Sequence, residues 1–139
     1  MKPAFELFDH TADIGIRARA ASLPDLLLAA KDGLYAVIGD LASAGPAEPV
    51  AFDLTGDDAA GLLRDFLHEL LILFERDGRV VTSLDVEAFD ESHLRATGQA
   101  DQVDPERSQF AREVKAITYH ELDVRRIHAG FEATVIVDI

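Results

Sequence analysis

Aspartates near both ends of the 139-residue chain are the strongest candidates for chemistry. Asp13 closes a polar segment, residues 9–13, that lies between two apolar stretches, and Asp138 is followed only by Ile139. Two carboxylates near contact distance repel each other unless a proton or a cation joins them, and calcium and magnesium prefer oxygen ligands. The α-carboxylate of Ile139 would add a third anionic group. If the strands that carry Asp13 and Asp138 are neighbours, these residues could form a site for a divalent metal ion, with Asp13, Asp138 and Ile139 as ligands.

A simpler interpretation of the same residues stays open. Asp13 would satisfy backbone amides of its own turn, and Asp138 would be a solvated strand end, both common roles for aspartate. His10 and His120 are expected to line the same region. A histidine near a turn or a strand end is more often a structural hydrogen-bonding residue than a ligand, so we leave both outside the metal set.

Lys115 is a third candidate, in the segment before His120. In a regular strand it would share a face with Glu113, Ile117 and Tyr119. Most lysines are exposed surface charges, which is the simpler interpretation here too. As a functional group, the ammonium would contact a phosphate or a carboxylate of a partner.

Two amphipathic helices are expected to position these residues. Ser22 begins a capping-box pattern, and apolar residues then recur at spacings of three and four over residues 23–41. Gly33 lies inside this helix, so either packing compensates for its low helix propensity or the helix bends there. Residues 55–58 form a second candidate box, and the helix that follows should stop at residues 77–78.

The rest of the chain alternates with a period of two, which is typical of strands. The expected strands cover residues 6–8, 14–20, 49–54, 80–88, 94–96, 114–118, 122–124 and 131–137. Strand runs interrupted by two helices and joined by short turns predict an α+β fold. We expect a single domain over residues 1–139, with a largely antiparallel sheet on which both helices pack.

Composition narrows the classes of function. The formal net charge of −13 would repel phosphate, so tight binding to bare nucleic acid is disfavoured, and a basic protein partner or a cation is favoured. The absence of cysteine excludes disulfides and thiolate zinc sites. The chain has neither a secretory signal pattern nor an apolar run long enough for a bilayer, so we expect a cytoplasmic protein without a membrane segment. Metalloprotease, EF-hand and phosphate-loop patterns are missing.

Three sequence stretches together resemble the signature of the archease family. They are FDHTADIG at residues 8–15, VKAITYH at residues 114–120 and VIVDI at residues 135–139. The resemblance covers the whole chain in order. It implies an accessory protein, not an enzyme, that activates an RtcB-type RNA ligase in tRNA splicing and RNA repair by promoting guanylylation of the ligase. It also implies that Asp13, Lys115 and Asp138 are the functional residues, and we expect the metal cofactor to be calcium.

Two other functions remain as alternatives. A small metal-dependent phosphoester hydrolase would use Asp13 and Asp138 to hold the cation and Lys115 to steady an oxyanion, but the sequence offers no general base beyond the two histidines. A module that binds RNA is disfavoured by the negative net charge of the chain and by the shortage of basic residues near aromatic ones.

Overall fold

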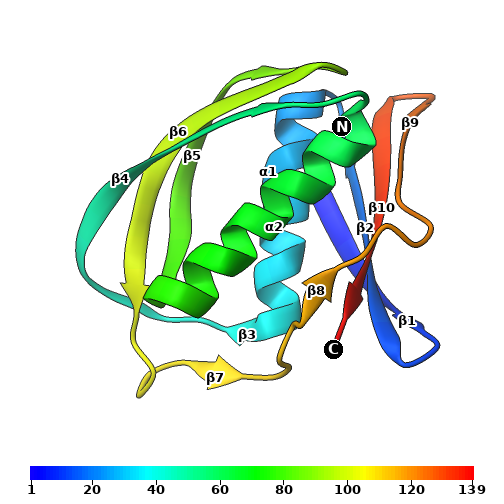
Figure 1. The fold of residues 1–139 in the computed structure, drawn as a ribbon. Coiled ribbons are helices and arrows are strands. Elements are labelled where there is room, and N and C mark those ends of the chain that lie inside the picture. Colours follow the sequence, from blue (N-terminus) through cyan, green and yellow to red (C-terminus); the bar gives the residue numbers. More distant parts are fainter.

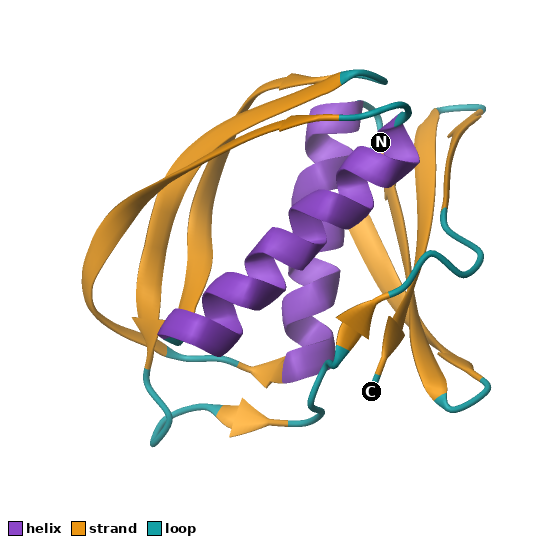
Figure 2. Ribbon diagram, viewed as in Figure 1, coloured by secondary structure: helices purple, strands orange, loops and turns teal.

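A computed structural model describes all residues 1–139. The chain forms two helices and ten strands, and every pair of neighbouring strands is antiparallel (Figures 1 and 2). The elements are β1 (Ala4–His10), β2 (Asp13–Ala20), α1 (Leu23–Ile38), β3 (Gly39–Asp40), β4 (Ser43–Thr55), α2 (Ala59–Asp77), β5 (Arg79–Phe89), β6 (His93–Val103), β7 (Gln109–Phe110), β8 (Ala116–Ile117), β9 (Asp123–Ile127) and β10 (Gly130–Asp138).

The strands form two larger sheets and one short pair. One sheet has the order β1-β2-β10-β8, with β9 also paired to β10; another has the order β4-β6-β5; and β3 pairs with β7. Figure 1 shows both helices between the two larger sheets. The predicted α+β class and antiparallel pairing are confirmed, but the strands divide into separate sheets where we expected one. Neither helix is long and apolar enough to cross a membrane.

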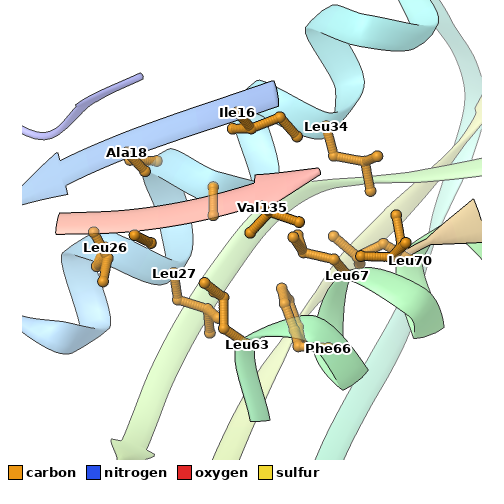
Figure 3. Packing of buried hydrophobic residues seen from close by; sticks show 14 of the residues in the cluster. Ile16, Ala18, Leu26, Leu27, Leu34, Leu63, Phe66, Leu67, Leu70 and Val135 are labelled. Carbon is orange, nitrogen blue, oxygen red and sulfur yellow. The ribbon is translucent and has the colours of Figure 1, made fainter. Parts of the chain in front are cut away.

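The helices lie between two sheets because each buries more than one stripe of apolar side chains. Leu26 and Leu34 of α1 and Leu63 and Phe66 of α2 are fully buried. They belong to one cluster of 28 buried residues that draws on both helices and both larger sheets. Figure 3 shows Ile16 of β2 near Leu34 in this core. The cluster fixes β2 and β10, the strands that carry the two candidate aspartates.

Helix α1 begins as predicted and ends earlier than predicted. The Ser22 hydroxyl accepts a hydrogen bond from the Asp25 amide at 3.2 Å, which confirms the N-terminal cap. The helix stops at Ile38, so Leu41 lies outside it. The chain leaves the helix because Gly39 pairs with β7, and a Cβ atom at Gly39 would lie 2.1 Å from the carbonyl oxygen of Gln109.

Helix α2 is capped by a different residue from the one expected. The Asp58 carboxylate accepts from the Gly61 amide at 2.7 Å, whereas Thr55 is the last residue of β4. The predicted stop is confirmed: the helix ends at Asp77, and Gly78 follows with a left-handed φ of 65°. Glycine adopts this conformation without steric cost, and its amide closes the last turn.

Gly33 is explained by packing against β2. A Cβ atom at this position would lie 2.6 Å from Cγ2 of Ile16. Alanine normally stabilises an exposed helix position relative to glycine by about 1 kcal/mol. Here we expect Gly33→Ala to lower the free energy of unfolding by about 1–3 kcal/mol, because the added methyl overpacks the core. Urea denaturation would measure this change.

A double-mutant cycle tests the cause of that loss. Ile16→Ala removes the clashing methyl, so it should cost less stability in the Gly33→Ala background than in the wild type. A Gly33→Ala protein more stable than the wild type would contradict the packing explanation.

Glu132 holds three strands together on the outer face of the β1-β2-β10 sheet. Only 7% of its side chain is exposed, and it accepts from Arg19 Nε at 2.6 Å and from Arg125 Nη2 at 2.7 Å. Arg19 is its cross-strand partner on β2, and Arg125 is its partner on β9. The hydrogen bonds from Arg125 and Arg19 lower the pKa of the Glu132 carboxyl below its ordinary value of 4.5.

A lowered pKa in the folded state means that the ionised carboxylate stabilises the fold above pH 4.5, and that this contribution is lost as the pH falls through the lowered value. We expect Glu132→Gln to cost about 1–2 kcal/mol at pH 7, since both arginines remain partly solvated. The difference from the wild type should shrink below pH 4.5. Urea unfolding of both proteins across pH 3–8 would measure it, and a difference that does not vary with pH would contradict this role.

Candidate functional site

Three neighbouring strands bring the N-terminal motif beside the end of the chain. Asp13 of β2 pairs with His10 of β1 on one side and with Asp138 of β10 on the other. Residues directly opposite on antiparallel strands point to the same face, with Cβ atoms about 5 Å apart. His10, Asp13 and Asp138 therefore form one row. In Figure 1 the C-terminus and the β1–β2 turn lie at the same end of the sheet.

This row lies on the face of the sheet that points away from the helices. Ile14 is 5% exposed and belongs to the core cluster, so Asp13, its neighbour in the strand, points outward. Asp13 is 26% exposed, and Asp138 is likewise only partly covered. The expectation that Asp13 and Asp138 meet on neighbouring strands is confirmed by the strand pairing.

The β1–β2 turn is held by an aromatic contact and by an unusual backbone conformation. Ala12 has a φ of +64°, a left-handed conformation that costs a non-glycine residue about 1–2 kcal/mol. Phe8 and Gly15 are cross-strand partners, and a Cβ atom at Gly15 would lie 2.1 Å from the Phe8 ring. The Arg17 guanidinium covers the same ring at 4.5 Å from its centroid. These contacts explain why a phenylalanine and a glycine flank the polar turn.

A backbone hydrogen bond holds Lys115 next to Asp138. Its amide donates a hydrogen bond to the Asp138 carbonyl oxygen at 2.7 Å, directly before β8 pairs with β10. Its side chain is exposed, and no ion pair in the structure involves it. In an acidic chain, this ammonium is free to meet an anionic group of another molecule.

The expected strand at residues 114–118 is wrong in its extent. Only Ala116–Ile117 pair as a strand, and Ile117 is buried although Lys115, two residues earlier, is exposed. Thr118 follows β8 and still contacts β10, because its hydroxyl and amide both donate to the Ile136 carbonyl oxygen, at 2.8 and 3.0 Å.

Arg64 of α2 anchors the segment that carries Lys115 and His120. Its Nε donates to the Ile117 carbonyl oxygen at 3.0 Å, and its guanidinium lies 4.5 Å from the centroid of the Tyr119 ring. A neighbouring Asp65 carboxylate at 3.1 Å holds the guanidinium in place. The second helix thus positions one side of the site, a link that the sequence pattern did not reveal.

Two histidines and a glutamate gather next to the row. The rings of His10 and His120 have centroids 5.2 Å apart, which confirms that both line the same region. Glu121 lies 3.2 Å from His10 Nε2 and 3.8 Å from His120 Nε2. His10 Nδ1 also lies 3.8 Å from the Asp13 carboxylate. Glu121 follows His120 in the sequence, where the pair fails the metalloprotease pattern, and the sequence did not predict it as a ligand.

The structure brings the predicted site residues together to different extents. The backbone brings Asp13, Asp138 and Lys115 together. The side chain of Ile139 follows β10 directly and packs against the core. Its α-carboxylate as a ligand stays a prediction.

Comparison with known proteins finds relatives that match nearly the whole chain. The family model described as the archease protein family (MTH1598/TM1083) matches residues 5–139. The chain belongs to the archease family. An archease of Methanopyrus kandleri is 33% identical over 138 residues, covering 97% of this chain and 99% of that protein. An archease of Methanosarcina acetivorans is 34% identical over 139 residues, covering 97% and 95%.

Solved structures show the same archease fold. The solution structure of protein 1598 of Methanobacterium thermoautotrophicum superposes with a TM-score of 0.74 at 28% identity, covering 97% of this chain and 98% of that one. The crystal structure of an archease from Thermotoga maritima superposes with a TM-score of 0.69 at 20% identity, covering 96% of each chain. The fold of this archease is therefore shared over 96–97% of the chain.

Proposed function

We propose that this archease activates an RtcB-type RNA ligase in tRNA splicing and RNA repair. In this proposal it promotes guanylylation and multiple turnover of the ligase and acts as an accessory protein in the cytoplasm, without a reaction of its own. The observation that carries the proposal is the Asp13–Asp138 strand pair with the Lys115 amide bonded to Asp138. Residues more than 100 positions apart meet in one place, and they are the three that the family resemblance implies are functional.

A divalent metal ion, calcium first, is the cofactor in this proposal. Asp13 of β2 and Asp138 of β10 are direct cross-strand partners. Their carboxylates offer only oxygen ligands, which suit a hard cation. Carboxylates opposite each other repel, so a cation between them would relieve a cost that the folded chain otherwise carries. The α-carboxylate of Ile139 is the third proposed ligand. The ion would neutralise this corner of the sheet and orient the carboxylates.

The partner in this proposal is the ligase protein and not RNA. The net charge of −13 opposes binding of a phosphate backbone, and it favours a basic protein surface. The Lys115 ammonium is the local exception, since it is exposed and unpaired at the edge of the site. It would reach a phosphate or a carboxylate at the ligase interface.

Hydrolysis of a phosphoester is the competing function. It has the same cation site, and His10 would be its nearest base, because the imidazole lies 3.8 Å from Asp13. However, the Lys115 side chain, which would steady the oxyanion, is exposed and has no ion-pair partner that fixes it, and catalysis needs positioned groups. This geometry favours an accessory role.

One assay separates the two functions. The protein alone is incubated with a phosphoester substrate and with GTP in the presence of calcium, and then with the cognate ligase, limiting GTP and a broken tRNA. We expect no turnover by the protein alone and repeated ligation when the ligase is present. Turnover without the ligase, or an unchanged ligase, would overturn the proposal.

A further inference from the structure

His10, His120 and Glu121 form a cluster of metal-ligating side chains beside the aspartate row. Each offers one ligand atom, and these atoms lie within 4.8 Å of one another. His10 comes from the end of β1, whereas His120 and Glu121 belong to the turn between β8 and β9. The cluster therefore joins two segments more than 100 residues apart.

The donor set differs in kind from the two aspartates. Two imidazoles and one carboxylate suit a borderline divalent ion such as zinc, whereas calcium takes oxygen ligands. Tetrahedral ligands about 2.1 Å from zinc are about 3.4 Å apart, so no separation between these ligand atoms needs to contract by more than about 1.4 Å. The side chains of His120 and Glu121 are 63% and 53% exposed and are free to rotate inward.

His10 has the orientation that a ligand needs. Its Nε2 faces Glu121 at 3.2 Å, while its Nδ1 is buried and has no hydrogen-bond partner. The nearest carboxylate to Nδ1 is that of Asp13 at 3.8 Å. Metal-bound histidines commonly donate their other ring N–H to a carboxylate, which fixes the tautomer and the ring plane. A small shift of the ring toward Asp13 would satisfy this buried atom.

We propose that His10, His120 and Glu121 form a second cation site, selective for a divalent ion of the zinc class, with Asp13 orienting His10. Three protein ligands leave one tetrahedral position open to water or to a group from a partner. The proposal does not rest on the proposed ligase activation. Its three ligands are distinct from those of the proposed calcium site, with which it shares only Asp13 as a neighbour.

Cobalt(II) is the probe, because its visible absorption reports four-coordinate binding and its affinity can be measured on the isolated protein. The protein is prepared without a histidine tag and stripped with chelator. We expect stoichiometric binding to the wild type, and a loss of affinity of at least about tenfold in His120→Ala and in Glu121→Gln. His128→Ala is the matched control, since His128 lies in the exposed β9–β10 turn and should bind like the wild type.

A second titration with calcium separates the two sites. Calcium affinity should be unchanged in His120→Ala, and cobalt binding should persist in Asp138→Ala. His120 and Glu121 are exposed, so both variants should keep the wild-type circular dichroism spectrum and melting temperature. Absence of cobalt binding by the wild type, or equal cobalt affinity in His120→Ala and His128→Ala, would overturn the proposal.

Discussion

Asp138→Ala is expected to abolish the stimulation of the ligase while the protein stays folded. The substitution leaves the backbone pairing of β10 with β2 and β8 intact, but it removes one of the two carboxylates that face each other across the strands. Calcium affinity should fall by at least about tenfold, because affinity at oxygen sites follows the charge of the ligands. Asp13→Ala should behave in the same way. Multiple-turnover ligation and calcium calorimetry would measure the two effects.

The stability of the calcium-free protein provides a further test of the same pair. Like charges directly opposite on antiparallel strands destabilise a sheet, so Asp138→Asn should be as stable as the wild type or more stable without calcium. Calcium should raise the melting temperature of the wild type, because it binds only the folded state, and should leave the variant unchanged. Asp85→Asn, an exposed change on β5 of the other sheet, is the matched control. Full stimulation by a folded Asp138→Ala protein would defeat the proposed site.

Lys115→Ala is expected to abolish the stimulation as well, but with calcium affinity retained or increased. An ammonium donates hydrogen bonds and cannot ligate a cation, and its positive charge opposes the binding of a nearby one. The side chain is exposed, so its removal should not change the melting temperature. The contrast between lost stimulation and retained metal binding separates this residue from the two aspartates.

Two variants control for the loss of positive charge at Lys115. Lys2→Ala removes an exposed lysine of the N-terminal segment and should leave stimulation unchanged. Lys115→Arg keeps the charge and should restore part of the activity, since the longer planar group does not reproduce the geometry of an ammonium. If Lys115→Ala lost calcium affinity as strongly as Asp138→Ala, the lysine would have a structural role instead.

The outer face of the sheet carries two kinds of potential metal ligands. The aspartate row provides oxygen atoms only, and the neighbouring cluster adds the imidazoles of His10 and His120. Asp13 takes part in both, because its backbone pairs with Asp138 and its carboxylate lies 3.8 Å from His10 Nδ1. Variants of Asp13 should therefore weaken both of the proposed cation sites, whereas Asp138 and His120 variants should separate them.

The amino-acid sequence alone determined the local elements that follow from short-range chemistry. The Ser22 cap depends on a side chain three residues from its amide partner, and the end of α2 depends on the freedom of Gly78 to adopt a left-handed conformation. Alternation in β2 placed Ile14 and Ile16 in the core and Arg17 on the outer face. The three motifs also identified Asp13, Lys115 and Asp138 as candidates, because the family resemblance implies functional residues at these motif positions.

Only the tertiary structure decided what these elements do together. The division into two sheets depends on which strands pair, and pairing joins residues too far apart for a local pattern to specify. The segment that follows Lys115 is held by contacts of Thr118 with β10 and of Arg64 with the Ile117 carbonyl oxygen, which a local alternation cannot specify. The same long-range packing brings Glu121 to His10, and so creates a donor set that neither segment has by itself.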